Sequence, residues 1–199
     1  AAVQRSADSQ RQSIILVRQT AQLPLRLEQY QNELAACCLL QTQDMAQARC
    51  MLREKKPSLV ILQNDAPGLD DMRAYSVLAA ENDAVFLLLV RQSTYPAVWQ
   101  MAQRAGICVM SWPADGGVLA QTLRNLLLVK KRMTSMQERT DELQMQLADL
   151  KRIQKAKSLL QRQLGMSEQD AHRWIEKAAM DRCVKKREIA ETVIRLYDT

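Results

Sequence analysis

The sequence predicts an α/β fold, a doubly wound domain with a five-stranded parallel sheet, followed by a long coiled-coil helix and a small all-α domain of three helices. Three features of the chain support this prediction. From residue 14 to about residue 128, short apolar runs alternate with helical patterns, which is typical of βα units around a parallel sheet. No Gly or Pro interrupts residues 118–164, so one long helix is expected there. Three short basic, amphipathic segments then occupy residues 151–199.

The α/β domain is expected at residues 14–123, after a polar leader at residues 1–13 that we expect to be disordered. Its helices show the usual spacing, and one predicted face carries Leu27, Tyr30, Leu34 and Cys37. Five strands alternating with five helices favour a flavodoxin-like topology. The strands are predicted at residues 14–17, 38–40, 59–62, 85–90 and 108–110.

Apolar residues in the long helix follow a three-four spacing, which is the heptad pattern of a coiled coil. The other faces are charged, so we expect residues 124–150 to pair with a second helix and form a dimer. The alternative is a single helix that packs on its own domain. Thr140 interrupts the apolar seam, and the flanking charges do not decide between parallel and antiparallel pairing. The predicted dimerisation residues are Leu126, Val129, Met133, Met136, Leu143, Leu147 and Leu150.

The terminal segment, residues 151–199, has clear helix boundaries. Gly165 is a predicted helix C-cap, and Ser167 with Asp170 resembles a capping box. Apolar stripes at helical spacing then predict a minimal three-helix core. The stripes consist of Ile153, Ala156 and Leu160; of Ala171, Trp174, Ile175 and Ala178; and of Ile189, Val193 and Leu196.

The positive charge of the chain is concentrated near this segment. Residues 1–123 contain 11 Lys and Arg and 11 Asp and Glu, whereas residues 124–199 contain 17 and 11. Such asymmetry indicates a polyanionic partner, because each neutralised phosphate releases counterions. A solvated helical surface is the alternative. The residues predicted to contact nucleic acid are Lys151, Arg152, Lys155, Lys157, Arg162, His172, Arg173, Arg182, Lys185 and Lys186.

Other functions find little support in the composition. The longest apolar runs, such as residues 84–90, are far shorter than a membrane span, and the five cysteines lack the spacing of a zinc site. We therefore expect a cytoplasmic protein with reduced thiols, no cofactor and no metal. No paired acids, nucleophile with a base, or Gly-rich phosphate loop is found, so an enzyme is not expected.

The terminal residues resemble the ANTAR domain, the RNA-binding module of transcription antitermination regulators. The string AKSLLQRQLGMSEQDAHRWIEKAAMDR, followed by REIA, carries the resemblance, which covers about residues 145–197. It implies binding of paired leader-mRNA hairpins, so that an overlapping terminator cannot form. Lys and Arg on phosphates and side chains that reach splayed loop bases are how proteins hold such RNA.

The first domain resembles a two-component receiver that has lost its phosphorylation chemistry. In the string PSLVILQNDAPGLDDM, Gln63 takes the position of the phosphoacceptor aspartate. Arg18 and Gln19 replace the acidic pair that holds Mg²⁺, and Trp112 replaces the lysine before Pro113. A glutamine cannot form an acyl phosphate, and the reaction requires an acid nucleophile and a metal. The resemblance also implies a cis bond before Pro113, and Asp65 is expected to point along the loop.

A degenerate receiver, a coiled coil and an ANTAR domain together resemble antitermination regulators of the AmiR and NasT type. The resemblance implies control by a cytoplasmic sensor subunit of periplasmic-binding-protein-like fold. We expect no membrane partner. Two other hypotheses stay open. The three basic helices could be a helix-turn-helix that reads duplex DNA, or the chain could be a protein-interaction module whose basic tail is incidental.

Overall fold

The structure is a computed structural model, and it describes residues 12–19, 24–30 and 37–197. The chain divides into two compact units, residues 1–133 and residues 134–199. The leader predicted at residues 1–13 lies outside the described residues, except that Gln12 and Ser13 belong to the first strand.

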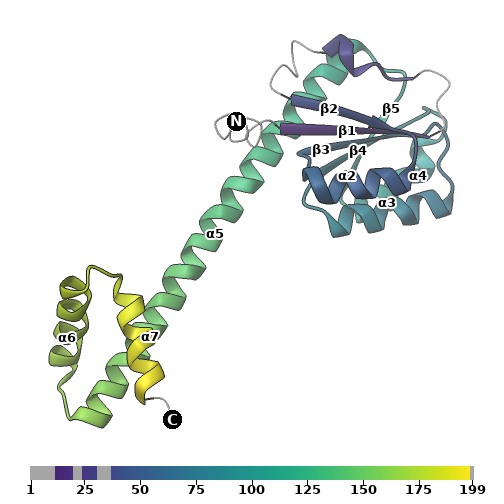
Figure 1. The fold of residues 1–199 in the computed structure, drawn as a ribbon. Coiled ribbons are helices and arrows are strands. Elements are labelled where there is room, and N and C mark those ends of the chain that lie inside the picture. Colours follow the sequence, from purple (N-terminus) through teal and green to yellow (C-terminus); the bar gives the residue numbers. More distant parts are fainter. Residues whose placement is uncertain (1–11, 20–23, 31–36, 198–199) are drawn as a thin grey trace. The chain divides into compact units, whose positions relative to one another are not determined.

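A five-stranded parallel sheet forms the centre of the first unit (Figure 1). Its order is β2-β1-β3-β4-β5, and every neighbouring pair is parallel. This order confirms the predicted flavodoxin-like, doubly wound fold. The strands are β1 (Gln12–Arg18), β2 (Cys37–Thr42), β3 (Leu59–Gln63), β4 (Val85–Val90) and β5 (Ile107–Ser111).

Apolar residues bury both faces of the sheet, because successive strand side chains point to opposite sides. In β1, Ile15 and Val17 join one core and Ile14 and Leu16 join the other. The first core is covered by α2 (Met45–Lys55), α3 (Leu69–Glu81) and α4 (Tyr95–Arg104), which lie on the same side of the sheet in Figure 1. The second is covered by the 3₁₀ helix η1 (Leu27–Tyr30) and the first turns of α5 (Gly116–Leu164).

The segment before β2 differs from the prediction. Cys37, predicted on a helix face with Leu27 and Tyr30, pairs with Gln12 at the start of β2. Residues 31–36 lie outside the described residues. Cys37 directly precedes the strand predicted at residues 38–40, and pairing with β1 extends that strand by one residue, which places Cys37 in the sheet.

The helix α5 begins at Gly116 and ends at Leu164, before Gly165, where the positive φ of 65° suits a glycine C-cap. Leu119, Leu123 and Leu127 bury one of its faces in the first unit. Beyond Leu127, several large apolar side chains of α5 are exposed, among them Met133 and Met136. Among the described residues, no helix combines the length and apolarity that crossing a bilayer requires.

In the second unit, the end of α5 packs with α6 (Glu168–Asp181) and α7 (Lys186–Tyr197) around a small apolar core. Ser167 caps α6 as predicted, because its Oγ accepts a hydrogen bond from the Asp170 backbone N–H at 3.1 Å. Two predicted core residues are exposed: Trp174 by 42% and Leu196 by 66%. The residues of α6 that are buried are Ala171, Ile175 and Ala179.

Candidate nucleic-acid interface

The position of the receiver phosphoacceptor is occupied by a buried glutamine. Gln63 ends β3 beside Arg18 of β1, and 1% of its surface is exposed. Its Oε1 accepts a hydrogen bond of 2.9 Å from the Leu25 backbone N–H, and Arg18 Nη2 donates one of 2.7 Å to the Leu25 carbonyl. Both side chains therefore bind the backbone that follows β1, at the edge where a receiver would hold phosphate and metal.

A hydrogen-bond network around the amide of Gln19 takes the place of the second acidic position. Gln19 Oε1 accepts a hydrogen bond from the Tyr75 hydroxyl, which in turn accepts one of 3.1 Å from Asn64 Nδ2. Burial raises the pKa of Tyr75 to about 12, and Asp71 also raises it, against the lowering effect of the Asn64 hydrogen bond. The network thus joins a protonated phenol to two uncharged amides, and Asn64 Nδ2 also lies 3.4 Å from Asp71 Oδ2.

The acid that remains next to Gln63 also has a structural role. Asp65 is 6% exposed, and its carboxylate lies 3.2 Å from Arg91 Nη2. No group of three or more potential metal ligands occurs among the described residues. Trp112 packs against the second core of the sheet, and the Trp112–Pro113 bond is cis, as the resemblance implied.

The basic residues predicted from sequence lie in the second unit on all three of its helices. Five of them lie on α5, two on α6, two in the α6–α7 connection and one on α7. In that order they are Lys151, Arg152, Lys155, Lys157 and Arg162; His172 and Arg173; Arg182 and Lys185; and Lys186.

Ion pairs separate eight of these ten residues into two groups; of the other two, His172 lies beside Glu176, and Lys155 also has an interaction partner. Lys157 Nζ lies 2.9 Å from Glu168 Oε1, and Arg152 Nη1 lies 3.0 Å from Asp149 Oδ1. Lys186 pairs with Glu176. Five others have no side-chain partner among the described residues and point their charge to solvent. They are Lys151, Arg162, Arg173, Arg182 and Lys185.

A hollow of about 360 Å³ opens where α6 meets α5, lined by Lys157, Glu168, Gln169, His172 and Arg173. The hydrogen bond from Lys157 lowers the pKa of Glu168, and the charge of Lys157 lowers it further. At the adjacent turn, Lys186 lowers the pKa of Glu176, whose carboxylate lies 3.3 Å from His172 Nε2. Both carboxylates are therefore ionised at neutral pH, and this surface carries both signs of charge.

Sequence reasoning identified Lys157, His172 and Arg173 in this hollow but missed Glu168 and Gln169. The concentration of positive charge pointed to the basic side chains alone. The signal was present, because Gln169 and Arg173 are four residues apart and so lie on one helix face.

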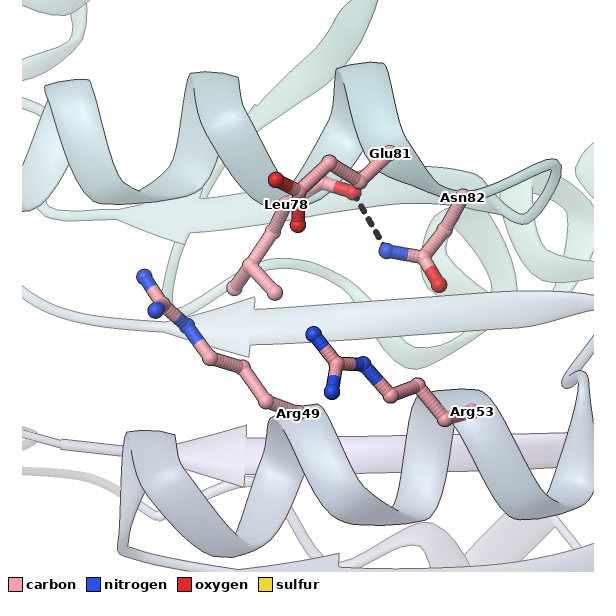
Figure 2. Close-up of a pocket in the computed structure, with 5 residues that line it drawn as sticks. All are labelled: Arg49, Arg53, Leu78, Glu81 and Asn82. Atoms are coloured by element: carbon pink, nitrogen blue, oxygen red, sulfur yellow. Dashed lines mark hydrogen bonds between the residues drawn. The ribbon is translucent and has the colours of Figure 1, made fainter.

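A second hollow, of about 210 Å³, belongs to the first unit (Figure 2). Arg49 and Arg53 of α2 extend toward Glu81 and Asn82 at the end of α3, where Asn82 Nδ2 donates a hydrogen bond of 2.8 Å to the Leu78 carbonyl. A helix that connects parallel strands runs antiparallel to them. This end of α3 therefore lies at the amino ends of the strands, whereas Gln63 lies at their carboxyl ends. The hollow includes none of the residues predicted to bind nucleic acid.

The predicted dimerisation residues lie on α5. Leu126 packs partly against the second core of the first unit, whereas the other six are exposed: Val129, Met133, Met136, Leu143, Leu147 and Leu150. Met145, which lies off this stripe, is equally exposed at 63%.

Comparison with known proteins agrees with the description of both units. Residues 141–194 match the ANTAR domain family. The chain is 28% identical over 144 residues to the transcriptional regulatory protein PdtaR of Mycobacterium tuberculosis, covering 72% of this chain and 70% of that protein. It is also 28% identical over 108 residues to the aliphatic amidase regulator of Pseudomonas aeruginosa, covering 54% and 55%.

A solved structure extends the likeness to the fold of the chain. The response regulator StyR superposes with a TM-score of 0.57 at 13% identity, over 94% of this chain and all of that one. At this identity the likeness concerns the fold alone, and it agrees with the receiver-like sheet order. Residues 141–194 of this chain therefore match the ANTAR domain family, and they follow a domain with a receiver-like fold.

Proposed function

We propose that the chain is an RNA-binding transcription antiterminator, which holds leader-RNA hairpins and so prevents a terminator from forming. The observation that carries the proposal is that five of the ten predicted contact residues are cations without a side-chain partner in the described chain. All five lie within or beside the helices matched by the ANTAR family, in a part of the chain with excess positive charge. In this proposal residues 14–123 are the input domain, residues 124–150 the stalk and residues 151–199 the output domain.

Unpaired cations favour RNA because they can neutralise phosphate without first breaking an ion pair. Lys151 and Arg162 lie on α5, Arg173 lies on α6, and Arg182 and Lys185 lie between α6 and α7. Their spread over three segments suits a folded RNA, whose phosphates face several directions around a loop.

Control of the proposed antiterminator falls to a protein partner instead of phosphate. With the buried amide of Gln63 and the guanidinium of Arg18 at this site, the described residues hold no group of three potential ligands for Mg²⁺. By resemblance to regulators of the AmiR type, the partner is a cytoplasmic sensor subunit with a periplasmic-binding-protein-like fold. The protein works as a homodimer through the exposed stripe of α5.

A competition experiment tests the RNA proposal. The full chain is incubated with a labelled RNA hairpin and then challenged with unlabelled hairpin or with duplex DNA of the same stem sequence. We expect the hairpin to compete at much lower concentration than the duplex. Equal competition, or preference for the duplex, would support a helix-turn-helix DNA reader and overturn the proposal. Absence of any binding at low salt would overturn it as well.

Salt dependence gives the same experiment a quantitative expectation. If the five unpaired cations each contact one phosphate, raising the salt concentration fourfold should weaken binding about 100- to 500-fold. A much weaker dependence would mean that the basic surface is incidental to function.

A further inference from the structure

We infer that the hollow between α5 and α6 is a base-reading pocket for one unpaired nucleobase that carries an exocyclic amino group. The inference rests on the proposed RNA-binding function and specifies which part of a loop this site recognises. With a volume of about 360 Å³, the hollow lies at the small end of the range for small-molecule sites, which suits a single base.

The charges of the hollow do not suit a phosphate. Lys157 would be the natural phosphate ligand, but its side chain is only 14% exposed and its ammonium is bound to Glu168. The Glu168 carboxylate is exposed and ionised, so it repels a phosphate that approaches the same space. A neutral ligand that donates hydrogen bonds is not repelled by this carboxylate.

The carboxylate can accept such hydrogen bonds. Glu168 Oε1 receives the Lys157 ammonium, whereas Oε2 has no hydrogen-bond partner among residues the structure describes. A carboxylate accepts hydrogen bonds from the amino group of a base, as Glu and Asp do with the N4 amino group of cytosine. Adenine, cytosine and guanine carry an exocyclic amino group, and uracil does not.

The remaining residues of the hollow can hold the other parts of a base. Gln169 and Arg173 are one turn apart on α6, exposed, and without a partner in the described part of the chain, so both can reach a base edge. His172 is half exposed, and its Nε2 lies 3.3 Å from Glu176, so we infer that its ring can stack on a base. Unpaired loop bases are the RNA groups that proteins read in this way, since the deep groove of an RNA helix excludes side chains.

A selection experiment with the full chain tests the inference. The probe is a pool of RNA hairpins that share one stem and have a fully randomised loop, and the bound fraction is sequenced. We expect the wild-type protein to exclude uracil at one loop position. In Glu168→Gln, the exclusion of uracil at that position should fall by about tenfold, while preferences at other positions stay the same.

The matched control is Glu188→Gln. Glu188 is an exposed acid in the first turn of α7 that does not line the hollow, and its replacement changes the net charge by the same amount. Electrostatics alone predicts that both variants bind all loops somewhat more tightly. A base-specific change confined to Glu168→Gln therefore separates the pocket from general charge.

Every result of the selection experiment either supports or overturns the inference. Identical base preferences in wild type and Glu168→Gln, or the same uniform tightening in both glutamate variants, would overturn the inference and leave RNA binding intact. If the wild type retains no RNA from the pool, the proposed function fails, and the inference fails with it; if it retains RNA without any base preference, only the inference fails. Gln169→Ala serves as a second variant in case Glu168→Gln disturbs Lys157. It removes an exposed side chain without partners, and it should relax the same loop position.

Discussion

At the scale of single residues, Gln63 explains why restoring an aspartate should not restore phosphorylation. An acyl phosphate requires a free carboxylate and a bound Mg²⁺, whereas Arg18 lies beside position 63 and no acidic pair is present on β1. In Gln63→Asp we expect the new carboxylate to pair with Arg18. Incubation with acetyl phosphate and Mg²⁺, followed by intact mass measurement, should show no added phosphate. A stoichiometric phosphate adduct would contradict this account of the site.

Tyr75 gives a stability prediction in the same region. Tyr75→Phe removes a buried hydroxyl and its two hydrogen bonds, after which Gln19 Oε1 and Asn64 Nδ2 keep only the longer bond of 3.3 Å to each other. The free energy of unfolding should therefore fall by about 1–3 kcal/mol. Urea denaturation with unchanged m-value measures this. The control is Tyr95→Phe, because Tyr95 stacks on Trp99 through its ring, and we expect a change below about 0.5 kcal/mol. Equal effects of the two substitutions would argue against the network.

The raised pKa of Tyr75 also predicts an alkaline pH dependence. The folded state holds the protonated phenol, so this contribution to stability is present below pH 10.0 and is lost as pH rises through about 12. The loss should amount to about 2–3 kcal/mol, since each pKa unit corresponds to about 1.4 kcal/mol. Chemical unfolding across this range measures it, and Tyr75→Phe should remove this part of the alkaline loss. An unchanged loss in Tyr75→Phe would place its origin elsewhere.

The sequence revealed which residues were replaced but not the contacts that the replacements make. Gln63, Arg18 and Gln19 could be placed by register with a receiver pattern. The bonds from Gln63 and Arg18 to Leu25 join parts of the chain far apart in sequence, and no local pattern encodes them. The same holds for Glu168, whose role depends on a lysine from another helix.

At the scale of elements, the helical period predicted where helices lie but not how much of each is buried. Trp174 fits the apolar stripe of α6, yet only Ala171, Ile175 and Ala179 are buried. A helix in a three-helix unit has few neighbours, so its buried stripe is narrow. Two alanines and one isoleucine, spaced four residues apart, then fill it, and the tryptophan at its margin stays exposed.

The exposed stripe of α5 yields a prediction about assembly. Leu143 lies on the stripe and is 65% exposed, whereas Met145 lies off it and is 63% exposed. If the stripe is a coiled-coil seam, Leu143→Glu buries a charge in the dimer and should weaken association by at least tenfold, whereas Met145→Glu should leave it unchanged. Sedimentation equilibrium measures both. Equal behaviour of the two variants would show that helix pairing does not use this seam.

At the scale of the whole molecule, the sheet order followed from alternation of strands and helices, because parallel strands connected by right-handed crossovers allow few arrangements. The charge partition also holds at this scale: the first 123 residues carry equal numbers of acids and bases, and the excess lies beyond them. The sequence alone could not show which basic side chains are free and which are paired with an acid. Lys185 and Lys186 are neighbours in the chain, and only the structure shows that Lys186 binds Glu176.

This distinction predicts different salt dependences for two adjacent substitutions. In Lys185→Ala, an unpaired cation is lost, so the slope of log affinity against log salt should become shallower by about 0.7–0.9. In Lys186→Ala, the lost charge was already neutralised by Glu176, so the slope should change much less. Hairpin binding measured over a salt series compares the two variants directly. If Lys186→Ala reduces the slope as much as Lys185→Ala does, RNA must displace Glu176 from Lys186, and the division into free and paired cations would not describe the bound state.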